Sequence, residues 1–174
     1  MNFVITAIPA CAVAGAILGL AACAAAPAVP ETLRPGANET LAMVVAAKGV
    51  QIYECRAKGA AHEWAFVAPE AELFDARGVP VGWHGAGPVW EAVDGSRVKG
   101  AVKARADAPS ANAIPWLLLA TRNDGPAGAF SAVSSIQRVN TAGGLPPQHG
   151  CTHATAGKQA RVNYVADYRF FTAR

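Results

Sequence analysis

The sequence has few charged residues, few aromatic residues and no cluster of basic side chains. Charged residues make up 16% of the 174 positions, against about 25% in an average soluble domain. Aromatic residues make up 7%, the net charge is +3, and the lysines and arginines are scattered singly between Arg34 and Arg174. Because nucleic-acid binding requires clustered basic side chains, we expect no nucleic-acid partner.

No charged side chain precedes Glu31. The apolar run before it is rich in alanine and ends in small residues, which is typical of a secretory signal, although no lysine or arginine lies near Met1. Within it, the stretch Leu20-Ala-Ala-Cys23 resembles the bacterial lipoprotein processing site, whereas Cys11 follows too short an apolar run. We therefore predict a lipoprotein-type signal peptide over residues 1–22 with a lipid on Cys23. Simple secretion after Ala-x-Ala cleavage is the alternative.

This start predicts where the protein resides. Residue Ala24 is not the aspartate that retains lipoproteins at the inner membrane, so we expect an outer-membrane lipoprotein facing the periplasm or the cell surface. The membrane is then a partner through the lipid on Cys23. Residues 23–40, rich in proline and alanine, are expected to form a tether, and residues 41–174 a single β-rich domain.

Only two of the four cysteines remain after these assignments, Cys55 and Cys151. An extracytoplasmic compartment oxidises thiols, so we predict a disulfide between them. Closing so long a loop stabilises a fold by about 4–5 kcal/mol from chain entropy, less any native strain. Two separately buried thiols are the alternative.

No stretch shows a sustained helical period, and several alternate as strands do. Residues 161–171 place Val162, Tyr164, Ala166, Tyr168 and Phe170 on one face. Residues 97–108 likewise place Val98, Val102, Ala104 and Ala106 opposite charged residues. The continuous apolar run of residues 114–121 suits a strand covered on both faces, with Pro115 at its beginning.

Turn signals divide the strands. We predict hairpin turns at Lys48-Gly49 and at Asp94-Gly95, the latter of type I′, and a bulge at Ser134-Ser135. The expected fold is all-β: an antiparallel sandwich or partly open barrel of about 8–10 short strands.

Catalytic and cofactor motifs are scarce. The sequence has no Gly-x-Ser-x-Gly, and the glycines of residues 85–87 lack the third glycine and the following helix of a dinucleotide site, so we expect no cofactor. His149 and His153 flank Cys151 and are weak candidates for metal ligands. Because a disulfide would remove the cysteine, we expect no metal.

The stretch from Trp83 to Ser96 holds the remaining candidates. Trp83 and His84 follow one another on a glycine-rich segment, as on the rim of a ligand-binding site. His84 with Glu91 or Asp94 is a weak candidate for acid–base catalysis. Alternatively, His84 is buried and hydrogen-bonded to a backbone carbonyl, while Trp83 covers the edge of the core. The first reading predicts that His84→Ala spares the melting temperature, and the second predicts a drop.

Six segments together resemble a known family: "VQIYEC", "WAFVAPEAELFD", "GWHGAGPVWEAVDGSRVKG", "IPWLLLA", "IQRVNTAGGLPPQHGC" and "VNYVADYRFF". They are similar, in order, to the uncharacterised domain of unknown function 3455. The resemblance runs from about residue 29 to residue 171. It implies a secreted or lipoprotein-like β-rich domain with no established activity, and the family's cysteine positions support the Cys55–Cys151 pairing.

These observations leave two function classes. The first is a non-enzymatic envelope domain that binds a small molecule, polysaccharide or protein. The alternative is an extracytoplasmic hydrolase or lyase that uses His84 with Glu91 or Asp94. A fold that places His84 within hydrogen-bond reach of a carboxylate in a concave site would favour the enzyme.

Overall fold

The structure, a computed structural model, describes residues 27–174 and contains eight antiparallel strands. They are β1 (Glu39–Lys58), β2 (Ala61–Phe74), β3 (Pro80–Gly85), β4 (Val89–Ala92), β5 (Arg97–Ala106), β6 (Trp116–Asn123), β7 (Val133–Gly143) and β8 (Gln159–Ala173). Two short 3₁₀ turns, η1 (Glu31–Leu33) and η2 (His153–Thr155), are the helical elements of the described part. The prediction of an all-β antiparallel fold is confirmed. No helix in this range is long and apolar enough to cross a membrane. The expected signal peptide and Cys23 lie outside the described residues.

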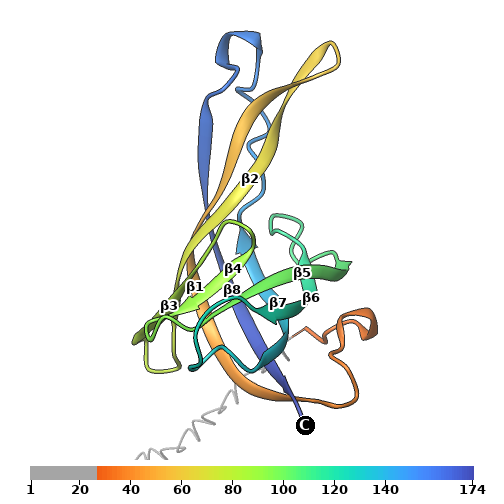
Figure 1. The fold of residues 1–174 in the computed structure, drawn as a ribbon. Helices are drawn as coiled ribbons and strands as arrows, with labels where there is room; N and C mark the ends of the chain where they lie inside the picture. Colours follow the sequence, from red (N-terminus) through yellow and green to blue (C-terminus); the bar gives the residue numbers. More distant parts are fainter. Residues whose placement is uncertain (1–26) are drawn as a thin grey trace, which may run out of the picture.

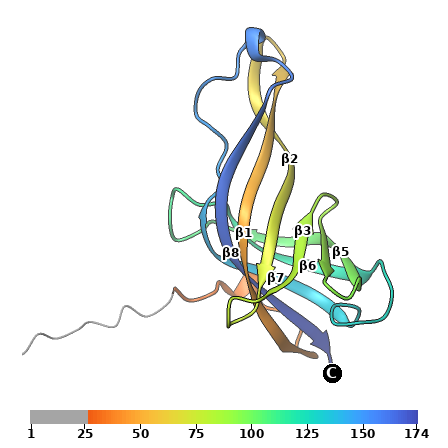
Figure 2. The same cartoon turned by 90° about the vertical axis from the view of Figure 1, so that its left-hand side faces the viewer.

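The sheet closes on itself. Each strand pairs with the next along the chain, and β8 returns to pair with β1. The structure is therefore a single closed sheet, which is nearer to the predicted partly open barrel than to the predicted sandwich. The strands are less uniform than predicted: β1, β2 and β8, with 20, 14 and 15 residues, extend beyond the shorter strands as a long three-stranded projection (Figures 1 and 2).

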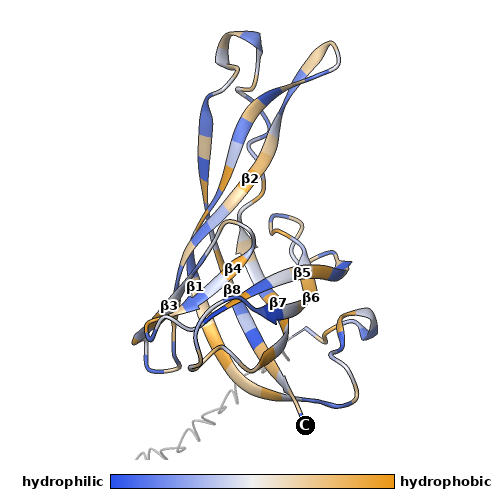
Figure 3. Cartoon of the chain, viewed as in Figure 1, coloured by the Kyte–Doolittle hydropathy of each residue, from blue (hydrophilic) through white to orange (hydrophobic). Residues whose placement is uncertain are grey.

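Alternation along the long strands directs apolar side chains to the interior, and Figure 3 shows hydrophobic and hydrophilic residues in turn along them. In β8 the predicted inward face is confirmed at Tyr164, Ala166, Tyr168 and Phe170, which are all buried, whereas Val162 is only partly buried. They join Val45 and other residues of neighbouring strands in the main core.

Strand β6 is covered on both sides, as its apolar run predicts. Leu119 packs in the main core, while Trp116 and Leu118 pack outside the ring against Leu33 of η1. The side-chain amide of Gln137 in β7 donates to the Leu33 carbonyl at 2.6 Å. The segment before β1 therefore closes the outer face of β6 and β7.

The predicted hairpin turn at Lys48-Gly49 is wrong, because both residues lie in the middle of β1. Gly49 is required there for close approach, not for a turn. A Cβ atom at this position would collide with the backbone of Glu70 and Ala71 on β2. At this point β1 and β2 approach each other so closely that only glycine can be accommodated at position 49.

The hairpin at Asp94-Gly95 is confirmed, but its turn type is not. Gly95 has a φ of +83°, whereas Asp94 is not among the residues with positive φ. The Gly95 amide donates to the Ala92 carbonyl, and the Ala92 amide donates to the Ser96 carbonyl, both at 2.9 Å. This is the three-residue loop in which a left-handed glycine closes the turn.

Of the register shifts in the sheet, two bear on the predicted strand faces. The predicted irregularity at Ser134-Ser135 is confirmed by a register shift between Val133 and Ser135. A second shift, between Val102 and Ala104 of β5, was not predicted. It places Val102 at an interior cavity and Ala104 on the outer cluster, so the face predicted to hold both is wrong.

Candidate functional site

The predicted disulfide between Cys55 and Cys151 is present, with Cα atoms 5.2 Å apart. It joins β1 to the loop that precedes β8. Backbone hydrogen bonds reinforce the link, from the Cys55 amide to the Lys158 carbonyl and from the Gly157 amide to the Cys55 carbonyl. The Trp64 indole also donates to the His149 carbonyl at 2.9 Å. The loop is therefore held along the projection of β1 and β2.

The two histidines that the sequence offered as metal ligands, His149 and His153, lie beside this disulfide in the segment before β8. No group of three or more potential metal ligands occurs within residues 27–174. His153 packs edge-on against His62, with ring centres 5.7 Å apart.

His84 lies inside the ring, as the alternative interpretation of its role predicts. Its side chain is 4% exposed, its Nδ1 lies 2.8 Å from the Val89 carbonyl oxygen, and its ring stacks on Trp90 at 4.1 Å. Since the carbonyl can only accept, Nδ1 carries the proton and donates. Burial lowers the pKa of His84 to about 3, because the charged imidazolium is poorly solvated there.

Trp83 lies on the opposite face of β3 and is 48% exposed. It pairs with Glu72 on β2 and with Glu91 on β4. Successive residues of a strand point to opposite faces, so the side chains of Trp83 and His84 diverge, although both residues border a surface pocket of about 450 Å³.

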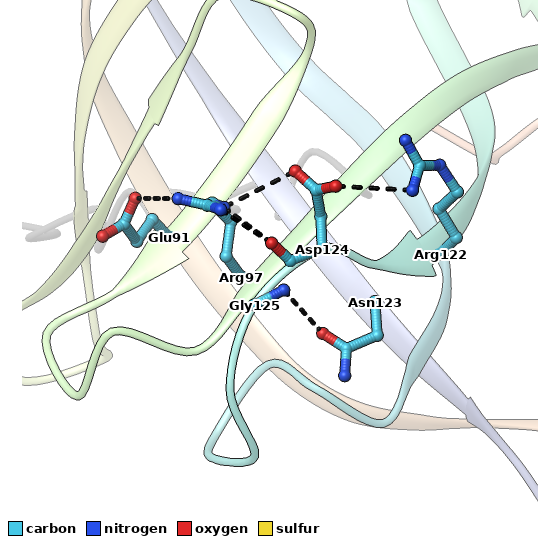
Figure 4. A network of polar contacts seen from close by, with 6 residues as sticks. All are labelled: Glu91, Arg97, Arg122, Asn123, Asp124 and Gly125. Atoms are coloured by element: carbon cyan, nitrogen blue, oxygen red, sulfur yellow. Dashed lines mark hydrogen bonds and ion pairs between the residues drawn. The ribbon is translucent and has the colours of Figure 1, made fainter.

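The three acid–base candidates are also separated. Glu91 lies on the outer face, where it pairs with Arg97 at 3.6 Å. Arg97 in turn contacts Asp124, which pairs with Arg122, in a surface network (Figure 4). Since His84 faces inward, no acid–base pair with Glu91 forms.

Asp94 holds two loops together. Its Oδ1 accepts hydrogen bonds from the Ser96 amide at 2.9 Å and from the Ser96 hydroxyl at 2.6 Å, and its Oδ2 accepts from the Ala129 amide at 2.8 Å. The pKa of Asp94 is lowered, mostly by the hydrogen bond from the Ser96 hydroxyl and next by the hydrogen bond from the Ala129 amide. The Ser96 Oγ also accepts from the Phe130 amide at 3.0 Å. These contacts assign Asp94 and Ser96 a structural role.

A cavity of about 310 Å³ lies inside the ring where the long strands leave the shorter ones. Its walls are mainly apolar and include Phe66, Val67, Trp90, Val102, Leu117 and Leu119. At its mouth Phe66 and Val102 are 52% and 58% exposed. A volume above about 300 Å³ with apolar walls is typical of a small-molecule site, and the interior of an eight-stranded ring is wide enough for one such molecule.

A second cavity of about 380 Å³ continues from the first. The two share Gln51, Phe66, Val102, Leu117 and Arg138 as lining residues. Leu145 and Pro146 from the loop that carries Cys151 form a further wall. The disulfide therefore fixes a loop that borders the candidate site.

A few polar groups interrupt the apolar walls. Gln51 is 2% exposed, and its Nε2 has no hydrogen-bond partner in the described chain. It faces the Tyr164 hydroxyl without an adequate hydrogen-bond geometry. The Trp90 Nε1 is likewise buried without a partner among the described residues. Buried donors without partners are rare in native structures, and a ligand in the cavity could supply the acceptor for these two.

The remaining polar group is the Arg138 guanidinium. Its Nε and Nη2 donate to the Pro115 carbonyl at 3.1 and 2.8 Å, and within residues 27–174 it forms no ion pair with a carboxylate. Arg138 lies opposite Tyr168 in the pairing of β7 with β8. Burial raises the pKa of Tyr168, and the Arg138 charge acts in the opposite direction. An unneutralised positive charge thus reaches the cavity.

The sequence interpretation missed Gln51 and Arg138. The signal for Gln51 is its position, since it continues the inward alternation of Ala47 and Gly49 toward Tyr53. A polar residue at an inward position of a strand is unusual. Arg138 follows Ile136 by two residues and therefore faces inward as well.

Comparison with known proteins identifies a family and no individual relative. A family model described as "Protein of unknown function (DUF3455)" matches residues 35–172. No curated protein and no solved structure matches the chain.

Proposed function

We propose a non-enzymatic binding function for this chain, which belongs to the DUF3455 family. The cavity inside the ring would hold one small, largely apolar molecule. The observation that carries the proposal is a cavity of about 310 Å³ with apolar walls, bordered by two of the three residues whose buried donors have no partner in the described chain, Gln51 and Trp90; the third, Trp116, lies in the outer cluster. A ligand acceptor would satisfy the donors of Gln51 and Trp90, and the apolar walls would cover its body.

Catalysis is not favoured by the arrangement of the interior. Of the three candidate residues, His84 borders the cavity and Glu91 and Asp94 do not. Burial keeps the His84 imidazole neutral, and its Nδ1 proton is donated to the Val89 carbonyl. Glu91 and Asp94 are engaged with Arg97 and Ser96 elsewhere. General acid–base work requires a positioned partner for the imidazole, and no carboxylate borders the cavity within the described residues.

Filling the cavity mouth tests the proposal. N-phenyl-1-naphthylamine is an uncharged apolar probe whose fluorescence rises when it leaves water. We expect saturable binding of this probe by the unaltered protein, and at least tenfold weaker binding by Val102→Trp, because the larger ring occupies the mouth. Fluorescence titration measures both dissociation constants.

Val165→Trp is the matched control. Val165 is also a strand valine, 42% exposed, but it borders neither cavity. It should leave probe binding unchanged. Absence of saturable binding by the unaltered protein, or equal binding by the two variants, would contradict an interior site.

We further propose that the domain works in the cell envelope as an outer-membrane lipoprotein. The support is the lipoprotein-like stretch that ends at Cys23 and the disulfide, which is typical of an oxidising compartment. A lipid on Cys23 would attach the binding domain to the membrane.

Metabolic labelling tests the anchor. Cells given radioactive palmitate should label this protein, and Cys23→Ser should abolish the label and release the domain from membranes, because the acylated thiol is lost. Cys11→Ser is the control and should leave labelling intact. Persistent label on Cys23→Ser would refute the assignment.

A further inference from the structure

The charges around the cavity are of one sign. Arg138 and Arg105 border the two connected cavities, and no aspartate or glutamate of the described chain does so. Arg105 is exposed, whereas Arg138 is partly buried. A solvated charge contributes little to binding, so the recognition of an anion would depend on Arg138.

Arg138 retains donors that can face the cavity. A guanidinium carries five N–H groups in a fixed planar arrangement, and the Pro115 carbonyl engages the Nε and Nη2 atoms. Nη1 does not donate to the Pro115 carbonyl, and the Tyr168 hydroxyl is a further neighbour of the guanidinium beside the cavity. The Pro115 contact also fixes the plane of the group. A fixed fork of this kind suits the two oxygens of a carboxylate.

Gln51 supplies a second, independent indication. Its Nε2 is buried, has no partner in residues 27–174, and belongs to a side chain that borders the same two cavities as Arg138. The buried amide can donate a hydrogen bond to an oxygen held beside the guanidinium.

We propose that the natural ligand of the cavity is a small carboxylic acid with an apolar body. Its carboxylate pairs with Arg138 and accepts from Gln51, and its body packs among Phe66, Val102 and Leu117. This inference rests on the proposed binding function and adds the chemical class of the ligand.

Displacement of N-phenyl-1-naphthylamine tests the inference at pH 7.5, where the acid is ionised. Decanoic acid and 1-decanol have the same chain and differ in the charged group. We expect decanoate to displace the probe from the unaltered protein at a concentration at least tenfold lower than 1-decanol. This comparison needs no variant and therefore does not depend on how a substitution affects folding.

Two arginine variants test whether Arg138 causes the preference for decanoate over 1-decanol. In Arg138→Met the advantage of decanoate should fall to less than twofold, while Arg105→Met should retain it. Equal displacement by the two compounds in the unaltered protein, or a preference that survives Arg138→Met, would overturn the inference and leave the binding function standing. Failure of the uncharged probe to bind would instead refute the binding function itself.

Discussion

Replacing Cys55 and Cys151 together by alanine is expected to lower the free energy of unfolding by about 4 kcal/mol. The bridge closes a loop across 96 positions of sequence, and a loop of that size constrains the unfolded chain by roughly 4–5 kcal/mol before native strain is subtracted. For a domain of this length the midpoint of thermal unfolding should fall by about 10 °C. Differential scanning calorimetry measures the change.

Reduction provides the control for this prediction. Adding a reductant to the unaltered protein should reproduce the loss, and adding it to the double variant should change nothing. The variant should also bind N-phenyl-1-naphthylamine more weakly, because the loop that carries Leu145 and Pro146 borders the cavity. A double variant as stable as the parent would show that the ring of strands holds this loop without the bridge.

His84→Ala is expected to lower the free energy of unfolding at pH 7.5 by about 1–3 kcal/mol or more. Truncation leaves the partly buried Val89 carbonyl without its donor, which costs about 1–3 kcal/mol, and it removes the ring that stacks on Trp90. The melting temperature should drop by several degrees. The sequence alone also allowed an unchanged melting temperature, because truncating a solvent-exposed imidazole would have had little effect on stability.

Lowering the pH should distinguish the contribution of His84 to stability from the contributions of the other titratable groups. The unfolded imidazole has its usual pKa of 6.5, and burial lowers the folded value to about 3. The unfolded state thus binds the proton first, so the stability present above pH 6.5 is lost as the pH falls toward 3. Between pH 7 and pH 4.5 the loss should be about 2–3 kcal/mol.

His84→Gln is the matched variant for the pH experiment. Its amide can donate to Val89 and does not titrate, so its stability should stay nearly constant between pH 7 and pH 4.5. The pKa values of Asp75 and Asp94 are lowered from 3.8, and those of Glu39 and Glu70 from 4.5, so any loss from these carboxyls is confined to the acid end of this range and is the same in both proteins. Equal losses in the two proteins, measured by urea unfolding, would show that His84 is not the group responsible.

Local sequence patterns predicted the strands well where alternation was unbroken. The inward face of β8 and the two-sided burial of β6 follow from side-chain period and run length alone. Gly49 misled the prediction because a glycine that admits a neighbouring backbone looks, in sequence, like a glycine in a turn. The bulge at Val102 has no sequence signal comparable to the serine pair of β7.

The candidate site was less predictable than the fold. The sequence pointed to Trp83 and His84 as neighbours, but adjacent strand residues face opposite ways, and only His84 reaches the interior side. Gln51 and Arg138 lie on strands that pair with β8 from opposite sides. Their meeting at one cavity depends on ring closure and register, which no short segment encodes.

Photo-crosslinking with a diazirine-bearing decanoate tests the central claim, a ligand inside the ring, most directly. After irradiation and peptide mapping we expect label on the cavity-lining stretches that contain Phe66, Leu117 and Leu119, and we expect unlabelled decanoate to compete it away. Label concentrated instead on outward side chains such as Trp83 or Val165, or label that excess decanoate does not displace, would contradict a binding site in the interior.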